Sequence, residues 1–293
     1  MDPRYWDEIV EVFKLMKSPM RPDRSESGCF HDWITERIHT AGLGRTPRID
    51  VLLLGVTVEL VELPWPDNVH LTAVDRSEGM IRAFWPGDIT GRRRLLRADW
   101  DGVSLAPESF HFAIGDGVLN ARTYPDDCRS FAARIREVLR PGGTFLLRAF
   151  VQPEQREDPA TIIEAMRAGQ ISTYNEFTFR FLTSLQMSAD EGVISTKPFI
   201  EGELERHGVD LADVYARTGY VPPARYVPPP AAEQAADSGR RVSFPTVREF
   251  EQVLSPNFQL LGRRYGTHPT AQRCPIFGLL REGELHPGTG TRQ

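Results

Sequence analysis

Five segments of strand length recur between residues 49 and 148, and most of them are apolar throughout. They span residues 49–54, 70–74, 94–98, 110–114 and 144–148. Apolar residues on both faces of a strand are typical of a parallel sheet that is buried on both sides. Stretches with helical spacing lie between these segments, at 77–84 and 127–139. The alternation predicts an α/β fold with a doubly wound, Rossmann-like sheet.

The chain before the first strand is predicted to be helical. Residues 5–16 carry apolar side chains at helical spacing, and Pro19 and Pro22 then interrupt the pattern. A second helix is predicted over 23–40. We therefore expect an N-terminal helical segment that spans residues 1–44.

Residues 151–240 interrupt the alternation of strands and helices. The spacing predicts four helices there, at 159–168, 174–186, 196–206 and 209–218. A proline-rich stretch at 220–238 predicts an exposed loop. We interpret 151–240 as a helical cap, a substrate insertion within the α/β core.

The α/β pattern resumes after this insertion. A helix is predicted at 246–254, followed by a closing pair of strands at 258–265 and 274–281. The predicted core therefore comprises residues 45–150 and 241–282, and residues 283–293 are expected to form a flexible tail.

Composition narrows the classes of partner. The 293-residue chain has 35 Lys and Arg against 40 Asp and Glu, a net charge of −5, which argues against a nucleic-acid partner. No apolar run reaches 18 residues, so we expect no membrane association, and the N-terminus lacks a signal-peptide core, which favours the cytoplasm. Cys29, Cys128 and Cys274 have no paired spacing, so neither a metal site nor a disulfide framework is predicted. The sequence predicts no particular oligomeric state.

The residues that follow the strands carry the candidate chemistry, because a doubly wound sheet binds ligands at the carboxyl ends of its strands. Asp75 is placed to accept hydrogen bonds from both hydroxyls of a ribose. Asp99 can accept one from an exocyclic amine such as N6 of adenine. Gly115 leaves room for a ligand close to the backbone. Taken singly, Asp75 could instead cap a helix and Asp99 could belong to a turn.

The order of these motifs resembles the class I S-adenosylmethionine-dependent methyltransferases. The resemblance rests on LLLGVTVEL, LTAVDRSEGMI, RADW, FHFAIGDGVLN and VLRPGGTFLL, and it covers residues 50–150 and 244–281. It implies S-adenosylmethionine as the cofactor and methyl transfer as the reaction. NAD binding is disfavoured, because no Gly-x-Gly-x-x-Gly turn is present to hold a pyrophosphate.

The first loop departs from the Gly-x-Gly-x-Gly pattern of that family, because Gly55 is its only glycine. Thr57 is then a candidate hydrogen-bond donor, and Glu59 a candidate partner of the cofactor's ammonium group. The predicted cofactor site comprises Gly55, Thr57, Glu59, Asp75, Arg76, Met80, Asp99, Trp100, Gly115, Asp116 and Asn120.

The acceptor is expected to be a small molecule, because the chain is acidic and the predicted insertion is rich in aromatic residues. Three alternatives remain at this stage: cyclisation or lysis of the cofactor itself, a non-catalytic cofactor-binding subunit, and a nucleotide-binding reductase. The loop after the fourth strand offers Asp116, Asn120 and Tyr124 to a substrate.

Tyr174 and Asn175 begin the most aromatic helix of the predicted cap. We predict that one of them lines the reaction pocket and orients the nucleophile or the amino-acid end of the cofactor. The alternative is that Asn175 caps this helix and Tyr174 packs against its next turn.

Other aromatic and histidine residues are assigned structural or surface roles. Phe177, Phe179 and Phe181 cannot all share one helix face, because they are spaced two apart. His111 is expected to be structural and His268 to be solvated, so neither is nominated as a base.

Overall fold

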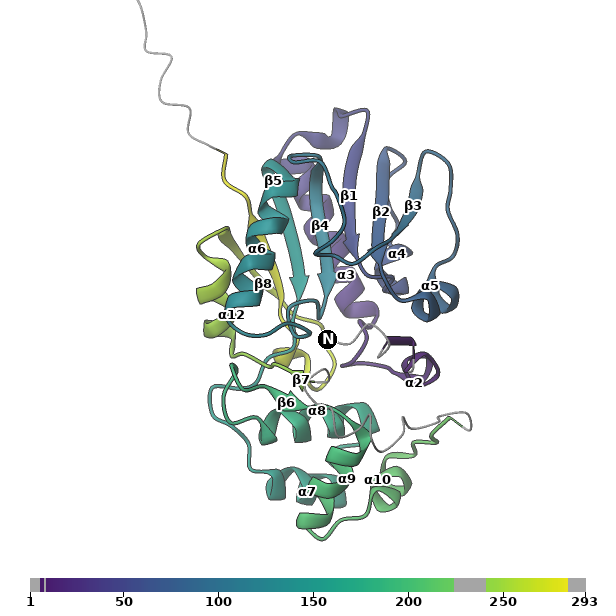
Figure 1. Cartoon of the computed structure of the whole chain (residues 1–293), viewed down its shortest axis with the longest axis vertical. Helices are drawn as coiled ribbons and strands as arrows, with labels where there is room; N and C mark the ends of the chain where they lie inside the picture. The colour runs from purple at the N-terminus through teal and green to yellow at the C-terminus, as the bar shows by residue number, and fades with distance from the viewer. Residues whose placement is uncertain (1–5, 8, 224–240, 284–293) are drawn as a thin grey trace, which may run out of the picture.

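A seven-stranded sheet forms the centre of the molecule (Figure 1). The computed structural model describes residues 6–7, 9–223 and 241–283. The sheet has the strand order β3-β2-β1-β4-β5-β9-β8. Its strands are β1 (Ile49–Leu54), β2 (Val69–Asp75), β3 (Arg93–Arg97), β4 (Phe110–Asp116), β5 (Leu139–Arg148), β8 (Gln259–Arg264) and β9 (Ile276–Leu280).

Strand direction divides this sheet into two parts. Strands β1 to β5 are parallel to one another, whereas β9 runs antiparallel to both β5 and β8. Because β1 lies between β2 and β4, the chain reverses its direction of winding there. This reversal places the ligand-binding edge at the carboxyl ends of β1 and β4. The predicted doubly wound, Rossmann-like α/β fold is confirmed.

Helices cover both faces of the sheet. The helices outside the insertion are α2 (Val10–Leu15), α3 (Arg24–Thr40), α4 (Val58–Val61), α5 (Glu78–Phe84), α6 (Asp126–Val138) and α12 (Val247–Leu254), with the short helices η1 (Leu43–Arg45) and η3 (Ala271–Arg273). Phe131 of α6 and Phe250 of α12 pack with Phe145 on one face. Phe30 and Trp33 of α3 pack on the other face. The capping box of Asp23 and Glu26 begins α3.

The insertion between β5 and α12 has an apolar core of its own. It contains α7 (Pro159–Arg167), α8 (Tyr174–Leu185), α9 (Lys197–Arg206) and α10 (Leu211–Thr218), and a two-stranded sheet of β6 (Val193–Ile194) and β7 (Arg241–Val242). Figure 1 shows these helices beyond the carboxyl edge of the sheet.

The three phenylalanines of α8 point in different directions, as their spacing predicts. Phe177 and Phe181 stack on each other with ring centroids 5.5 Å apart. Phe179 instead meets the rings of Phe150 and Phe244, each at 5.7 Å. Helix α8 therefore packs on both sides, and Phe179 connects the insertion to the end of β5.

Several boundaries differ from the sequence prediction. Helix α4 and the β6–β7 pair were not predicted, because each is too short for periodicity to detect. The N-terminal helix predicted over 5–16 includes α2 at Val10–Leu15. The predicted loop at 220–238 lies, from residue 224 onward, outside the described residues, as does the tail from residue 284.

Candidate active site

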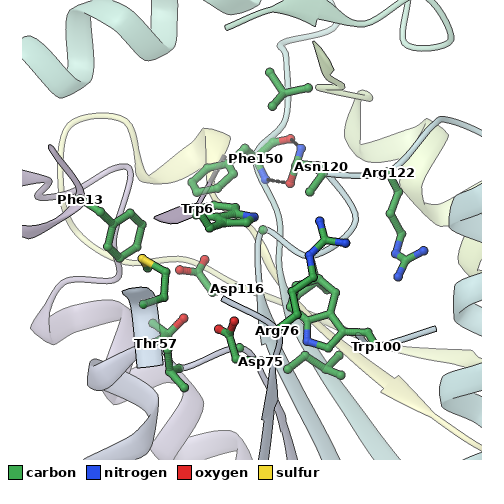
Figure 2. A pocket seen from close by; sticks show the side chains of 18 of the residues that line it. Trp6, Phe13, Thr57, Asp75, Arg76, Trp100, Asp116, Asn120, Arg122 and Phe150 are labelled. Atoms are coloured by element: carbon green, nitrogen blue, oxygen red, sulfur yellow. Dashed lines mark hydrogen bonds between the residues drawn. The ribbon is translucent and has the colours of Figure 1, made fainter. Parts of the chain in front are cut away.

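A pocket of about 260 Å³ opens at the carboxyl edge of the sheet. Apolar side chains from the N-terminal segment form one wall, namely Trp6, Ile9, Phe13, Met16 and Met20. The insertion and the chain that follows it supply Leu182, Ser195, Val242 and Phe244. The rest of the lining comes from residues after β1, β2, β3, β4 and β5 (Figure 2). The pocket therefore lies where the topology predicts a ligand.

Asp75 ends β2 with a partly buried carboxylate on the pocket wall. Its Oδ1 accepts a hydrogen bond of 2.8 Å from the backbone N–H of Ser77. Burial raises the pKa of this carboxyl to about 6, although backbone N–H groups of Ser77 and Val56 and the charge of Arg76 oppose the rise. Further hydrogen-bond donors would stabilise the ionised form of such a carboxylate.

The residues after β3 form the next part of the wall. Asp99 pairs with Arg76 at 2.5 Å and accepts from the backbone N–H of Asp101 at 2.9 Å. Burial acts to raise the pKa of Asp99, but these hydrogen bonds outweigh it and hold the pKa below its usual value. The indole of Trp100 donates to the carbonyl of Val74 at 2.7 Å, which fixes its ring beside the pocket.

The first loop places glycine where the backbone requires it. Gly55 has φ of +94°, a conformation that other residues rarely adopt, and its Cα faces Asp75 and Trp100. Thr57 lines the pocket and precedes α4. Glu59 lies off the pocket wall, where its Oε1 pairs with Arg21 at 2.6 Å.

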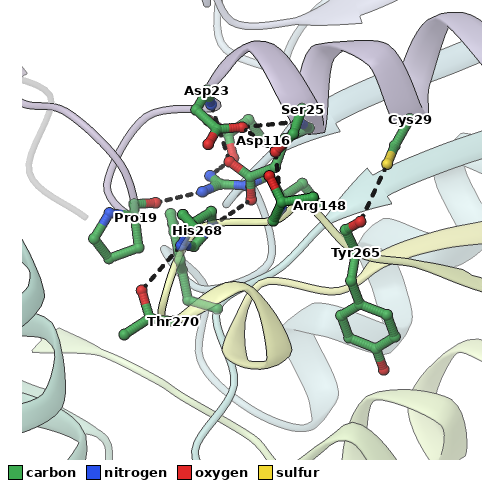
Figure 3. A network of polar contacts seen from close by, with 12 residues as sticks. Pro19, Asp23, Ser25, Cys29, Asp116, Arg148, Tyr265, His268 and Thr270 are labelled. Carbon is green, nitrogen blue, oxygen red and sulfur yellow. Dashed lines mark hydrogen bonds and ion pairs between the residues drawn. The ribbon is translucent and has the colours of Figure 1, made fainter.

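Asp116 ends β4 and lines the floor of the pocket. Its Oδ1 accepts from Nη1 of Arg148 at 2.7 Å, and Nε of Arg148 donates to Glu26 at the same distance. Arg148 also donates to the carbonyl of Pro19 (Figure 3). Burial raises the pKa of Asp116, although the Arg148 charge opposes this. Arg148 thereby connects β4, α3 and the N-terminal segment.

Two predictions about neighbours of this network had different outcomes. His268 is not solvated as predicted, because its side chain is 8% exposed and its Nε2 lies 3.2 Å from Glu26. The loop between β8 and β9 folds inward onto α3 and buries this imidazole. His111 is structural as predicted, with Nδ1 accepting from the backbone N–H of Asp50 at 3.0 Å.

Asn120 lines the pocket, but its amide is already bound to the backbone. Its Nδ2 donates to the carbonyls of Phe150 and Ser243 at 2.7 and 2.6 Å, and its Oδ1 accepts from the N–H of Phe150 at 2.9 Å. Asn120 therefore joins the loop after β4 to the end of β5 and to the end of the insertion.

Comparisons with solved structures find the same architecture at low sequence identity. A Rhodobacter sphaeroides structure named "Putative Zn-dependent Alcohol Dehydrogenases" is 15% identical over 96% of this chain and 98% of its own, with a TM-score of 0.51. The N-methyltransferase NodS from Bradyrhizobium japonicum was solved in complex with S-adenosyl-L-homocysteine. It is 10% identical over 97% of this chain and 100% of its own, with a TM-score of 0.49. A SAM-dependent methyltransferase structure from Methanosarcina mazei is 14% identical over 82% of this chain and 94% of its own, with a TM-score of 0.42. No family model matches the sequence, and no curated protein matches it significantly.

These similarities concern the fold alone. The parallel strands, the reversal at β1 and the antiparallel β9 beside β5 agree with the architecture that the sequence resemblance implies. The fold is the Rossmann-like α/β fold that the sequence predicts. The predicted residues Gly55, Thr57, Asp75, Arg76, Met80, Asp99, Trp100, Asp116 and Asn120 all line the pocket.

Five other predicted residues are not among the pocket-lining ones, namely Glu59, Gly115, Tyr124, Tyr174 and Asn175. Besides Glu59, Gly115 is absent from the wall, which Gly117 and Val118 form instead. Tyr174 stacks on Tyr220 with ring centroids 4.2 Å apart. Nδ2 of Asn175 donates to the carbonyl of Lys17 at 3.0 Å. The catalytic role predicted for Tyr174 or Asn175 therefore has no support from contact with the pocket.

Sequence reasoning did not find several residues that shape the site. Arg122 lines the pocket and pairs with Asp101 at 3.0 Å and Asp127 at 2.9 Å. For Arg148 the sequence predicts only a place in a strand. Its signal was an arginine at the end of an otherwise apolar strand, which needs carboxylate partners when buried.

Glu26, His268 and Cys274 lie close enough together to hold a metal ion, within the part of the chain that the structure describes. Glu26 already accepts from Arg148 and contacts His268. Burial raises the pKa of the Cys274 thiol to about 12, so the thiolate that binds metals is disfavoured. The adjacent guanidinium of Arg148 also repels a cation.

None of the described helices is long and apolar enough to cross a membrane.

Proposed function

We propose that this protein is an S-adenosylmethionine-dependent methyltransferase that acts on a small-molecule acceptor. The partly buried carboxylate of Asp75, at the end of β2 and on the pocket wall, is the observation that carries the proposal. A ribose supplies two hydroxyl donors to a carboxylate at this position, which offsets its desolvation.

The lining residues fit the remaining parts of this cofactor. Asp99 keeps lone pairs beyond those bound by Arg76 and Asp101, so it can accept from the adenine amine. Met80 and Trp100 offer apolar and aromatic surface for the adenine ring. Gly55 and Thr57 are placed for the amino-acid end, where the absence of a side chain at Gly55 leaves space.

The chain's own residues bind the cofactor and the acceptor, orient them and exclude water from the pocket. S-adenosylmethionine, when bound, supplies a methyl group activated by a positive sulfur, so the reaction depends mainly on alignment of a nucleophile. Trp6 and Phe13 cover the pocket from the N-terminal side, and Phe244 covers it from the side of the insertion. In the proposed domain roles, residues 1–44 and 151–240 together close the site over the core.

Calorimetry with S-adenosylmethionine and S-adenosylhomocysteine tests the cofactor assignment. Asp75→Ala is expected to weaken binding by about 10- to 150-fold, because charge-assisted hydrogen bonds to the ribose are lost. A matched control is Asp126→Asn, since Asp126 is an exposed residue outside the pocket. Unchanged affinity in Asp75→Ala would refute the assignment.

Product analysis separates methyl transfer from other reactions of the cofactor. Incubation of the protein alone with S-adenosylmethionine should leave the cofactor intact. S-adenosylhomocysteine should form only when an acceptor is added. Methylthioadenosine without an acceptor would instead indicate cyclisation or lysis.

A further inference from the structure

The pocket wall carries more negative than positive side chains. Five carboxylates and two guanidinium groups line it, namely those of Asp75, Asp99, Asp101, Asp116, Asp127, Arg76 and Arg122. With all of them ionised, the wall carries a net charge of −3. The proposed cofactor has a net charge of +1, so its binding leaves the wall negative. Such a wall repels an anionic acceptor and attracts a cationic one.

These charges are compensated unevenly around the pocket. Arg76 pairs with Asp99, and Arg122 is shared by Asp101 and Asp127. Asp99 and Arg76 belong to the side of the wall that is assigned above to the adenine end, and Arg122 offsets the charges of Asp101 and Asp127. The excess charge at the pocket floor is therefore a separate feature.

Asp116 supplies that charge at the floor. Its side chain is 7% exposed, and Arg148 pairs with its Oδ1. The same guanidinium also pairs with Glu26, so one positive charge serves two carboxylates. Among the described residues, the side-chain hydrogen bond found at this carboxylate is the one from Arg148 to Oδ1. Figure 2 shows this carboxylate between Trp6 and Asp75.

The wall on the insertion side of the pocket is apolar. Phe150 and Phe244 line it, and the buried ring of Phe179 packs against both of them. Leu182 and Val242 extend the same surface. This wall suits an aromatic or aliphatic body, because it offers contact area and few polar partners.

We propose that the acceptor is a small apolar amine whose ammonium group is bound by Oδ2 of Asp116, while its apolar body lies against Phe150 and Phe244. This inference rests on the proposed function and names its class of acceptor. Arg148 and Glu26 act as positioning residues, because they fix the Oδ1 side of the carboxylate and leave Oδ2 toward the pocket.

The same carboxylate can accept the proton that an ammonium must lose before nitrogen becomes a nucleophile. One N–H bond breaks, its electron pair stays on nitrogen, and the proton forms an O–H bond with Oδ2. That proton is released to water when the product leaves. Burial and the nearby charges of Glu26 and Glu59 raise the pKa of Asp116, whereas Arg148 lowers it, with a net rise that favours proton acceptance.

A series of matched probes tests the binding step. The probes are benzylamine, 2-phenylethylamine and 1-naphthylmethylamine, each compared with the alcohol and the carboxylic acid of the same ring system. Calorimetry is performed on the full chain saturated with S-adenosylhomocysteine. At least one amine should bind about 10- to 150-fold more tightly than its alcohol, and the acids should bind most weakly.

Variants of Asp116 test the residue itself. Asp116→Asn should remove the advantage of the amine, and Asp116→Glu should restore part of it. In Asp116→Asn the affinity for S-adenosylhomocysteine should fall by a smaller factor than the affinity for the amine. Asp126→Asn, which removes the same charge from an exposed site, should behave like the unmodified protein.

The pH profile of methylation tests the proton step. In Asp116→Asn the tightest-binding amine must arrive unprotonated, so kcat/KM should rise about tenfold per pH unit between pH 7 and 9. The unmodified protein should show a much flatter profile. Parallel profiles, or no methylation of any amine in the series, would refute the proposal.

The binding outcomes separate the two proposals. If S-adenosylhomocysteine does not bind the unmodified protein, the proposed function fails. If it binds and no amine binds more tightly than its alcohol, only the amine inference is wrong. If Asp116→Asn weakens S-adenosylhomocysteine as much as the amine, Asp116 serves the cofactor and the inference is wrong. The probe series on the unmodified protein decides the question even if Asp116→Asn fails to fold.

Discussion

Asn120 and Phe150 are joined by two hydrogen bonds, one in each direction between the Asn120 amide and the Phe150 backbone. A third bond from the same amide reaches the carbonyl of Ser243, 123 residues further along the chain. One buried side chain thus fixes Phe150 and the start of the returning chain on the pocket wall. The aromatic wall of the pocket depends on this connection.

Replacement of Asn120 by Ala should destabilise the protein. The change leaves two buried carbonyls and one buried N–H without their partners, so we expect the free energy of unfolding to fall by about 3 kcal/mol. Urea denaturation measures this change. Asn175→Ala is the matched control, because its amide makes one bond near the surface and should cost less than about 1 kcal/mol. Equal losses in the two variants would contradict the role given to Asn120.

Removal of the Arg148 guanidinium should be more damaging. Arg148→Met leaves the buried carboxylates of Glu26 and Asp116 without their cation, and we expect a loss of about 3–5 kcal/mol in unfolding free energy. Arg263→Met is a suitable comparison, because the pair of Arg263 with Glu251 is partly exposed and should contribute less than about 1 kcal/mol. A loss below 1 kcal/mol in Arg148→Met would show that the network contributes little.

Cofactor binding should weaken as the pH falls through the pKa of Asp75, about 6. The ribose hydroxyls donate to the ionised carboxylate, so below this pH a proton must leave before the cofactor binds. Affinity for S-adenosylhomocysteine should therefore fall roughly tenfold between pH 7 and pH 5. The same raised pKa means that Asp75 favours folding most at low pH, and that this contribution is lost as the pH rises from about 4 to 6.

Calorimetry at several pH values checks this dependence. Asp75→Asn should bind more weakly at pH 7 and should lose the pH dependence of this group. Persistence of the full dependence in Asp75→Asn would assign it to another group.

The close approach of the N-terminal segment to α5 offers a further test. The backbone N–H of Gly79 donates to Asp7 at 2.6 Å, and a Cβ at Gly79 would lie 2.8 Å from Val10. Gly79→Ala should therefore displace the segment that covers the pocket and weaken S-adenosylhomocysteine binding by about tenfold, the equivalent of one charged hydrogen bond. In Gly28→Ala, where the added methyl meets nothing, a gain of about 0.5–1 kcal/mol in stability is expected instead.

Tyr174 provides a test of the catalytic role predicted from sequence. Because the Tyr174 hydroxyl is hydrogen-bonded to Tyr215 and the residue lies off the pocket wall, Tyr174→Phe should lower the free energy of unfolding by about 1 kcal/mol and leave turnover unchanged. Thermal denaturation and an assay with an identified acceptor measure the two effects. A loss of rate at an unchanged melting temperature would support the catalytic prediction instead.

The sequence by itself determined the elements of the sheet and the edge at which a ligand binds. Apolar runs predicted β1, β2, β4 and β5, since burial on both faces leaves a local pattern in each strand. Asp75 follows the run that predicted β2, and Asp99 follows the segment that predicted β3, so their common position at the carboxyl edge follows from the parallel order alone. Such information lies within a few residues of each element.

Only the tertiary structure decided which side chains meet at that edge. Arg148 pairs with Glu26, 122 positions away, and His268 contacts the same carboxylate from the opposite end of the chain. Tyr174 begins an aromatic helix, as predicted, but the packing of the insertion places its ring beside Tyr220 and brings Phe244 to the pocket instead. Periodicity specifies which face of a helix is buried, whereas the partner of that face depends on contacts between segments far apart in the chain.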